Sequence, residues 1–247
     1  MPTADSSLVN ETYWLNVHVS SRTDTIKNIC IHHMAGNLSL KGCYSVWTQN
    51  EASAHYAIDS NGKIGQYVPE AKKAWACGNG NSQTINIELA DDVIGKNDGT
   101  GWHTTDAAIE ACAKLVADIA KRYGWSSVSF DPNKGKNTTH GIVVHKWYMS
   151  TSCPCNYVYG KLSYIAEKAN KILKGEEEEE VTQEQFNEMM DNYLAARNKK
   201  AESAWAKKAG TVAWAKEAGI TSDGSSPQGF ATRQEIWQMF KAQEEKK

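Results

Sequence analysis

The sequence predicts an α/β protein with a mixed central β-sheet flanked by helices, followed by a small helical module. Short apolar segments of strand length, among them Asn28–His33 and Thr84–Ala90, alternate with longer segments whose apolar residues recur every three or four positions. A run of five glutamates, Glu176–Glu180, then interrupts the pattern. These observations predict a first domain over residues 1–174, an acidic linker over 175–181 and the helical module over 182–247.

Composition narrows the class of protein. The 247 residues are 40% hydrophobic and 23% charged, as in ordinary soluble proteins, and the net charge of −2 does not favour nucleic acid as a partner. The chain contains no apolar run long enough to cross a bilayer, which argues against membrane insertion. Its first residues lack the basic start and apolar stretch of a signal peptide. We therefore expect synthesis in the cytoplasm and release by another agent if the protein acts outside the membrane.

The strand around Glu88 carries the first candidate for chemistry. Apolar Ile85, Ile87 and Leu89 alternate with polar positions, so Glu88 is expected on the face opposite the apolar one. An arbitrary glutamate in a strand is usually a solvated charge. Glu88 is of interest because histidines and a cysteine elsewhere could share its site.

Histidines stand at the ends of two predicted strands. Asn28–His33 reads as a buried strand that ends in His32-His33, and only one of these two side chains can face a given site because neighbours on a strand alternate. Residues 141–144 form another short apolar strand, which delivers His145 at its end. A lone histidine in such a place is more often a satisfied core residue than a ligand.

The cysteines fall into two groups. Six are too few and too scattered for a disulfide scaffold in a chain of this size. Cys30 and Cys112 lie in apolar patterns and are expected in the core. Cys153 and Cys155 follow His145 closely, in a spacing that indicates ligand chemistry.

The predicted helices are expected to pack on the core and to carry no catalytic residues. Thr105 is a credible N-cap and Gly124 a credible end for a helix, and the apolar stripe of a second helix runs over residues 161–173. Asn61-Gly62 predicts a tight hairpin turn between two strands, and residues 69–83 read as a loop. In the C-terminal module, Trp205, Trp214 and Trp237 could stack on sugar rings or form the module's core, and the sequence favours neither interpretation over the other.

A zinc site can be built from these parts. Zinc prefers nitrogen and sulfur ligands, and catalytic sites keep three protein ligands with one position open to water. His32, His145 and Cys153 come from separate segments, which suits such a site. Glu88 could then take a proton from the water and pass it to a leaving amine.

Several motifs carry a resemblance to a known family. The chain resembles the zinc-dependent N-acetylmuramoyl-L-alanine amidases of the T7-lysozyme and peptidoglycan-recognition-protein type, and within them the endolysins of phages that infect clostridia-like bacteria. The resemblance covers about residues 7–173 and rests on Ile31-His32-His33, Ser53-Ala54-His55-Tyr56, Ile85-Asn86-Ile87-Glu88, and His145 with Ser150-Thr151-Ser152-Cys153-Pro154.

The resemblance implies a function for these residues. His32, His145 and Cys153 would bind Zn²⁺, and Glu88 would be the catalytic base for cleavage of the amide between N-acetylmuramic acid and L-alanine. Peptidoglycan would be the partner, while the C-terminal module, which resembles that of such endolysins less specifically, would bind wall polymer or self-associate. Residues expected near the substrate are His55, Tyr56, Trp75 and Thr151.

Two positions depart from the family pattern. Many relatives carry lysine where this chain has Thr151, so a lower rate is expected. The usual glycine after Cys-Pro is Cys155, which could compete for the metal or pair with Cys153. The alternatives are an impaired or inactive peptidoglycan-binding module of the same fold, a cysteine peptidase using Cys153 or Cys77, and a structural zinc site that takes Cys155 or His33 as its fourth ligand.

Overall fold

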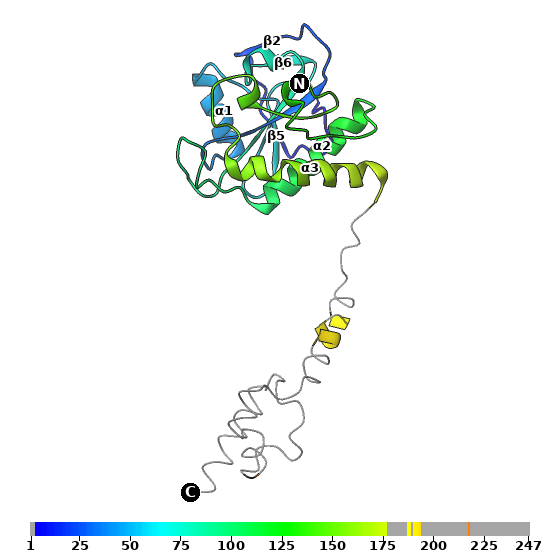
Figure 1. Cartoon of the computed structure of the whole chain (residues 1–247). Helices are drawn as coiled ribbons and strands as arrows, with labels where there is room; N and C mark the ends of the chain where they lie inside the picture. Colours follow the sequence, from blue (N-terminus) through cyan, green and yellow to red (C-terminus); the bar gives the residue numbers. More distant parts are fainter. Residues whose placement is uncertain (1–2, 177–186, 189, 194–216, 218–247) are drawn as a thin grey trace, which may run out of the picture. The chain divides into compact units, whose positions relative to one another are not determined.

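The computed structural model describes residues 3–176, 187–188, 190–193 and 217 (Figure 1). Contacts divide the chain into two compact units, Met1–Glu177 and Glu178–Lys247, and this division falls within the glutamate run. The expected apolar and tryptophan pattern of the C-terminal module lies almost entirely outside the described residues. The account below concerns the first unit.

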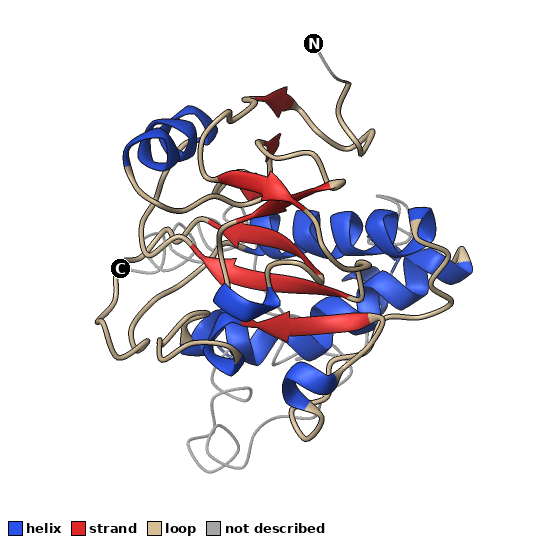
Figure 2. Ribbon diagram, turned by 90° about the horizontal axis from the view of Figure 1, so that it is seen from above, coloured by secondary structure: helices blue, strands red, loops and turns tan. Residues whose placement is uncertain are grey.

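A six-stranded mixed sheet forms the centre of this unit, with strand order β1-β5-β4-β7-β3-β8 (Figure 2). The strands are β1 (Glu11–Thr12), β3 (Asn28–His33), β4 (Tyr56–Ile58), β5 (Ile64–Gln66), β7 (Thr84–Leu89) and β8 (Gly141–Val144). Within this sheet, the β4–β5 pair is antiparallel and the other pairs are parallel. A separate antiparallel pair joins β2 (Val19–Ser21) to β6 (Lys72–Ala74).

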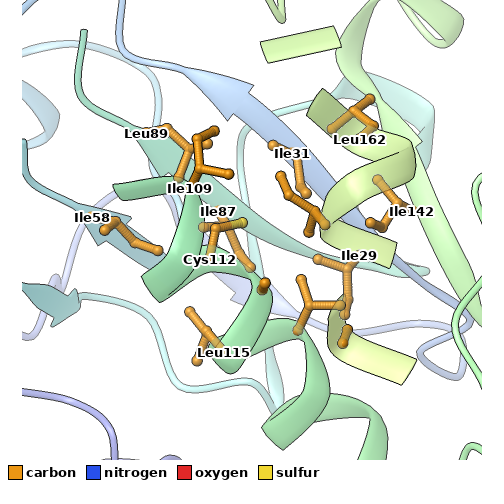
Figure 3. Packing of buried hydrophobic residues seen from close by; sticks show 14 of the residues in the cluster. Ile29, Ile31, Ile58, Ile87, Leu89, Ile109, Cys112, Leu115, Ile142 and Leu162 are labelled. Atoms are coloured by element: carbon orange, nitrogen blue, oxygen red, sulfur yellow. The ribbon is translucent and has the colours of Figure 1, made fainter. Parts of the chain in front are cut away.

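Two long helices cover one face of the sheet. They are α2 (Asp106–Arg122) and α3 (Asn156–Lys174), which pack on each other and on β7 and β8. Figure 3 shows Ile109 and Leu115 of α2 and Leu162 of α3 against the isoleucines of the strands. Burial of this apolar surface, at about 25 cal/mol per Å², supplies the main stabilisation of the fold.

The ends of α2 follow from its sequence. The Thr105 hydroxyl accepts a hydrogen bond from the Ala108 amide, and Gly124 adopts the left-handed conformation just past the helix. Helix α3 begins at Asn156, earlier than the apolar stripe at 161–173 predicted, because its first turn already packs on the core through the buried Val158. Gly175 ends it, also with a positive φ.

The opposite face of the sheet is more polar. It carries Cys30 and His32 of β3, Asn86 and Glu88 of β7, and Val143 of β8, because these residues pair across the parallel strands in one register. Helix α1 (Leu40–Gln49) packs near β4 on this side through a cluster that includes its Leu40 and Trp47. The remaining 3₁₀ turns are η1 (Gly78–Gly80), η2 (Gly135–Asn137) and η3 (His145–Trp147).

Some expected loops are ordered as strands. The segment expected to be a loop over 69–83 contains β6, which pairs with β2. Both strands are short and mostly polar, so hydrophobic periodicity carries little signal for them. The hairpin turn holds as predicted, with Gly62 at a φ of 79°.

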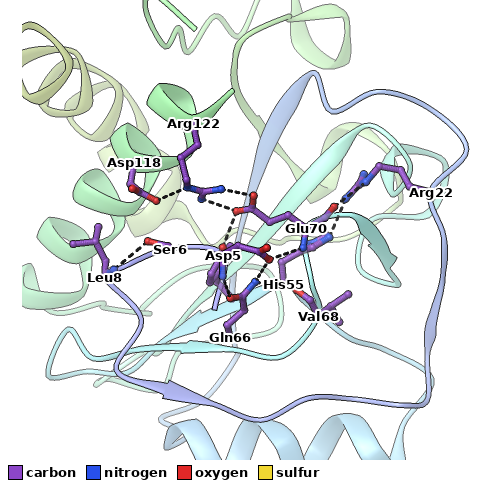
Figure 4. Close-up of polar contacts among 11 residues, drawn as sticks. Asp5, Ser6, Leu8, Arg22, His55, Gln66, Val68, Glu70, Asp118 and Arg122 are labelled. Atoms are coloured by element: carbon purple, nitrogen blue, oxygen red, sulfur yellow. Dashed lines mark hydrogen bonds and ion pairs between the residues drawn. The ribbon is translucent and has the colours of Figure 1, made fainter. Parts of the chain in front are cut away.

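A buried ion pair ties the N-terminal segment and α2 to the sheet (Figure 4). The guanidinium of Arg122 binds both oxygens of Glu70, at 2.6 and 2.8 Å. The Tyr56 hydroxyl donates to Glu70 Oε1 at 2.7 Å, and the Glu70 amide donates to Asp5 at 2.8 Å. Each charge that is removed from water therefore has charged or hydrogen-bonded partners.

Candidate active site

Three donors meet at the carboxyl end of the central strands. His32 is the next-to-last residue of β3, His145 directly follows β8, and Cys153 lies in the loop before α3. The ligand atoms of these three side chains lie within 4.8 Å of one another. The structure thus brings together all three residues that the sequence singled out as metal ligands.

The spacing within this group suits a tetrahedral ion. Zinc–nitrogen bonds of about 2.0 Å and zinc–sulfur bonds of about 2.3 Å place neighbouring donors about 3.3–3.7 Å apart. The Cys153 Sγ lies 3.6 Å from His32 Nδ1. The imidazole rings of His32 and His145 have their centroids 4.9 Å apart. The donor set therefore fits a zinc-type cation.

Asn86 orients the first of these ligands. The His32 Nε2–H donates to Asn86 Oδ1 at 3.0 Å, which leaves Nδ1 as the lone-pair nitrogen that faces Cys153. The side-chain Nδ2–H of Asn86 in turn donates to Thr84 Oγ1 at 3.2 Å. In the sequence, Asn86 stands out only as part of a motif, although its place on the same strand face as Glu88 points to this role.

Electrostatics favour the ligand form of both histidines. Burial and the neighbouring His145 lower the pKa of His32 to about 3, and burial lowers the pKa of His145 as well. Burial raises the pKa of the Cys153 thiol, and the carboxylate of Glu88 adds to that effect. Neutral imidazoles beside a thiol that a cation would deprotonate are the chemistry of a metal site.

Glu88 lies next to this group. It pairs with His32 across the strands, and its Oε1 is 3.8 Å from His32 Nδ1. The side chain is 17% exposed, and its Oε2 is buried without a hydrogen-bond partner. Burial raises the pKa of Glu88 to about 8, with His33 opposing and Asp91 adding to the rise. A carboxylate with a free oxygen and a pKa near neutrality has the properties of a general base.

Cys155 does not join the first group. All six cysteines are free thiols, and Cys155 faces His33 and Asp91 on the other side of the sheet. Of the two adjacent histidines only His32 faces the candidate site, as strand alternation predicted. Among the described residues, the first group therefore has three protein donors, which is the number typical of catalytic zinc sites rather than closed structural ones.

Two residues expected near the substrate are buried. His55 Nδ1 accepts a hydrogen bond from the backbone N–H of Asn86. Its Nε2 lies 3.1 Å from the Lys72 carbonyl oxygen and 3.0 Å from the Arg22 guanidinium. Burial and Arg22 lower its pKa to about 3. Tyr56 points to the opposite face, where it binds Glu70. Neither side chain has exposed surface in this structure, so both have structural roles here.

The other two residues expected near the substrate, Trp75 and Thr151, are exposed to solvent. Trp75 is 40% exposed and donates its Nε1–H to Ser20 at 3.1 Å. Thr151 is exposed, and its hydroxyl accepts from the Cys153 amide at 3.2 Å. Met149, which the sequence analysis did not single out, is half exposed and places its sulfur 3.4 Å from His145 Nε2.

Comparison with known proteins identifies the family. The Amidase_2 family, described as N-acetylmuramoyl-L-alanine amidase, matches residues 22–156, which is more than half of the chain. The chain belongs to this family of amidases. N-acetylmuramoyl-L-alanine amidase A of Achromobacter lyticus is 35% identical over 138 residues, covering 53% of this chain and 73% of that protein.

Solved structures are similar to this chain, and one of them is similar enough to show the fold. The Staphylococcus aureus hydrolase AmiA, solved in complex with its ligand, matches with a TM-score of 0.51 at 19% identity, over 67% of this chain and 84% of that one. The endolysin amidase LysCS from Clostridium intestinale matches at 15% identity with a TM-score of 0.46, over 64% of this chain and 97% of that one. The mixed sheet with its helices is therefore an amidase fold, and the chain is an N-acetylmuramoyl-L-alanine amidase whose substrate is peptidoglycan.

Proposed function

We propose that this amidase is a zinc enzyme in which His32, His145 and Cys153 hold the ion and Glu88 is the general base. The observation that carries the proposal is the convergence of two imidazoles and one thiol beside a carboxylate whose Oε2 has no partner. When bound, zinc would polarise the scissile carbonyl and acidify a water molecule. The reaction is hydrolysis of the amide between the lactyl group of N-acetylmuramic acid and L-alanine.

Glu88 would move the proton in this reaction. Its free Oε2 takes a proton from the attacking water, whose oxygen forms a bond to the amide carbon. The C–N bond then breaks, and Glu88 returns the proton to the nitrogen of the departing L-alanine. The products are a lactyl carboxylic acid, which loses its remaining proton to solvent, and a free amine, and Glu88 ends in its starting state.

His32 would be held in its productive tautomer by Asn86. Because Nε2–H is committed to Asn86, Nδ1 keeps its lone pair toward Cys153 and Glu88. Thr151 occupies the position where many relatives have lysine, so no cationic side chain is expected there to stabilise the developing oxyanion. Exposed Trp75 is proposed to contact the substrate, since its indole face could pack on a sugar ring.

The biological role is proposed to be that of a phage endolysin for a clostridia-like host. The motif resemblance and the endolysin names among the fold neighbours support this role. The enzyme would reach the wall only after release from the cytoplasm, and the C-terminal module would bind wall polymer or self-associate. Among the helices the structure describes, none combines the length and apolar character needed to cross a membrane.

The proposed function is tested by measuring the amine product of the reaction. The native chain and Glu88→Ala are loaded with zinc and incubated with purified Gram-positive cell walls, and newly exposed N-terminal alanine is measured. The proposal predicts release by the native chain alone, while both proteins retain the ion. Equal release by both proteins would remove Glu88 from the mechanism. The binding-module alternative predicts that both proteins bind walls and that neither releases alanine.

A further inference from the structure

A second group of metal-type donors lies on the other face of the sheet. It consists of His33, Asp91 and Cys155, whose ligand atoms are within 4.8 Å of one another. The His33 Nδ1 lies 3.0 Å from Asp91 Oδ2, and the Cys155 Sγ lies 4.0 Å from Asp91 Oδ1. The amidase mechanism uses none of these three side chains.

Three separate parts of the fold supply the donors. His33 is the last residue of β3, Asp91 follows β7 by two residues, and Cys155 is the N-cap residue directly before α3. Because His32 and His33 alternate across β3, the second group is separated from the first by the sheet itself. The two groups therefore do not share a donor.

All three donors are withdrawn from solvent. Asp91 and Cys155 have no exposed surface, and His33 is 8% exposed. The ring of Trp102 packs edge-on against His33, with ring centroids 5.1 Å apart. Carboxylate, imidazole and thiol groups are rarely gathered in a dry pocket unless something compensates for their loss of water.

Neighbouring polar groups hydrogen-bond to the Asp91 carboxylate and hold it in place. The Thr104 hydroxyl donates to Asp91 Oδ1 at 3.2 Å, and the Gly36 amide donates to Oδ2 at 3.3 Å. Ligating carboxylates are commonly held by such outer hydrogen bonds. The ion pair with His33 and these two hydrogen bonds together satisfy Asp91, while the Cys155 thiol lies beside His33 and contacts Asp91 only at the limit of a sulfur hydrogen bond.

We propose that His33, Asp91 and Cys155 are the three protein ligands of a second divalent cation of the zinc type. Neighbouring donors in a tetrahedral zinc site lie about 3.3–3.7 Å apart, a range that falls between the 3.0 and 4.0 Å separations found here. The ion would fasten the end of β3 and the segment after β7 to the start of α3. A site this deeply buried would be loaded as the protein folds.

Metal stoichiometry tests the proposal on the full chain. Zinc is removed under denaturing conditions, and the refolded protein is titrated with Co²⁺ while thiolate-to-metal absorption is recorded. Each group contains one cysteine, so the native chain is expected to bind two equivalents, each with its own thiolate signal. Saturation at one equivalent with one thiolate signal would overturn the second site, and this readout needs no variant to fold.

Variants assign the equivalents. Cys155→Ala is expected to bind one equivalent and still release alanine from cell walls, whereas Cys153→Ala is expected to bind one and release none. Cys112→Ala, a buried cysteine in the core cluster of α2, is the matched control and should keep both equivalents. If Cys155→Ala binds as many equivalents as the native chain, the second site is refuted. The proposed amidase mechanism stands or falls separately, on Cys153→Ala.

Discussion

His32 and Glu88 are register partners on adjacent parallel strands, and His32 Nδ1 lies 3.8 Å from Glu88 Oε1. Side chains paired in this way share one face of the sheet, so the backbone alone holds a proposed metal ligand beside the proposed base. Rigid strands position such groups more reliably than loops do. The other two donors, His145 and Cys153, come from segments that follow β8, and they complete the group from one side.

Asn86 is predicted to control metal affinity through His32. Asn86→Ala removes the acceptor for His32 Nε2–H, so zinc should bind about 10- to 100-fold more weakly, as measured by competition with a chelator. Asn86→Asp keeps an oxygen acceptor and is the control, expected to retain most of the affinity. Equal losses in both variants would show that Asn86 acts by some route other than this hydrogen bond.

Glu88 is predicted to make the metal-free protein less stable as pH rises. Its pKa is about 8 in the folded chain against an ordinary 4.5, so between these values the folded state holds a proton that the unfolded chain has released. Stability should therefore fall with rising pH across this window, by at most about 1.4 kcal/mol per pH unit from this group.

Urea unfolding in the presence of a chelator, at several pH values between 5 and 8 (roughly the window of the shift), checks this prediction. Glu88→Gln lacks the titrating group, so the free energy of unfolding of the variant should rise relative to that of the native chain as pH increases. Groups that do not interact with Glu88 titrate alike in both proteins and cancel in the difference. A difference that stays constant with pH would contradict the assigned pKa.

The Arg122–Glu70 pair is predicted to stabilise the fold. Arg122→Met leaves Glu70, whose side chain is 3% exposed, without its charged partner, and should cost about 2–3 kcal/mol in the free energy of urea unfolding. This cost is smaller than that of breaking a fully buried ion pair because the arginine is partly exposed. Lys171→Met breaks an exposed pair with Glu167 and should cost less than about 0.5 kcal/mol. Similar losses for the two variants would contradict the role given to burial.

Trp75 is predicted to bind the substrate without taking part in proton transfer. Trp75→Ala should raise KM for soluble wall fragments roughly 3- to 10-fold with little change in kcat, because one aromatic packing contact is lost in ground and transition states alike. Tyr164→Ala, an equally exposed aromatic residue on α3, is the control and should leave KM unchanged. A fall in kcat with constant KM would argue against this role.

Much of the fold could be predicted because it follows local rules. The strand at Asn28–His33, the caps of α2 and the Asn61-Gly62 turn depend on neighbours along the chain, and they appear as expected. The alternation of His32 and His33 and the core positions of Cys30 and Cys112 follow in the same way.

Other features depend on partners distant in sequence. His55 and Tyr56 are buried because Arg22 and Glu70 satisfy their polar groups, and no periodicity of the sequence indicates those pairings. Cys155 was expected to compete with or pair with Cys153. Its packing against His33 and Asp91 depends on where α3 begins, and this start lies earlier than the apolar stripe suggested.

The central claim is that Glu88 moves the proton while His32, His145 and Cys153 hold the metal. The most direct measurement compares the zinc content of the native chain and Glu88→Gln with their release of N-terminal alanine from purified cell walls. The account predicts that the variant keeps the zinc bound at this site and loses at least 100-fold of the rate, an effect on the order expected for a general base. A variant that holds the same zinc and releases alanine at the native rate would contradict it.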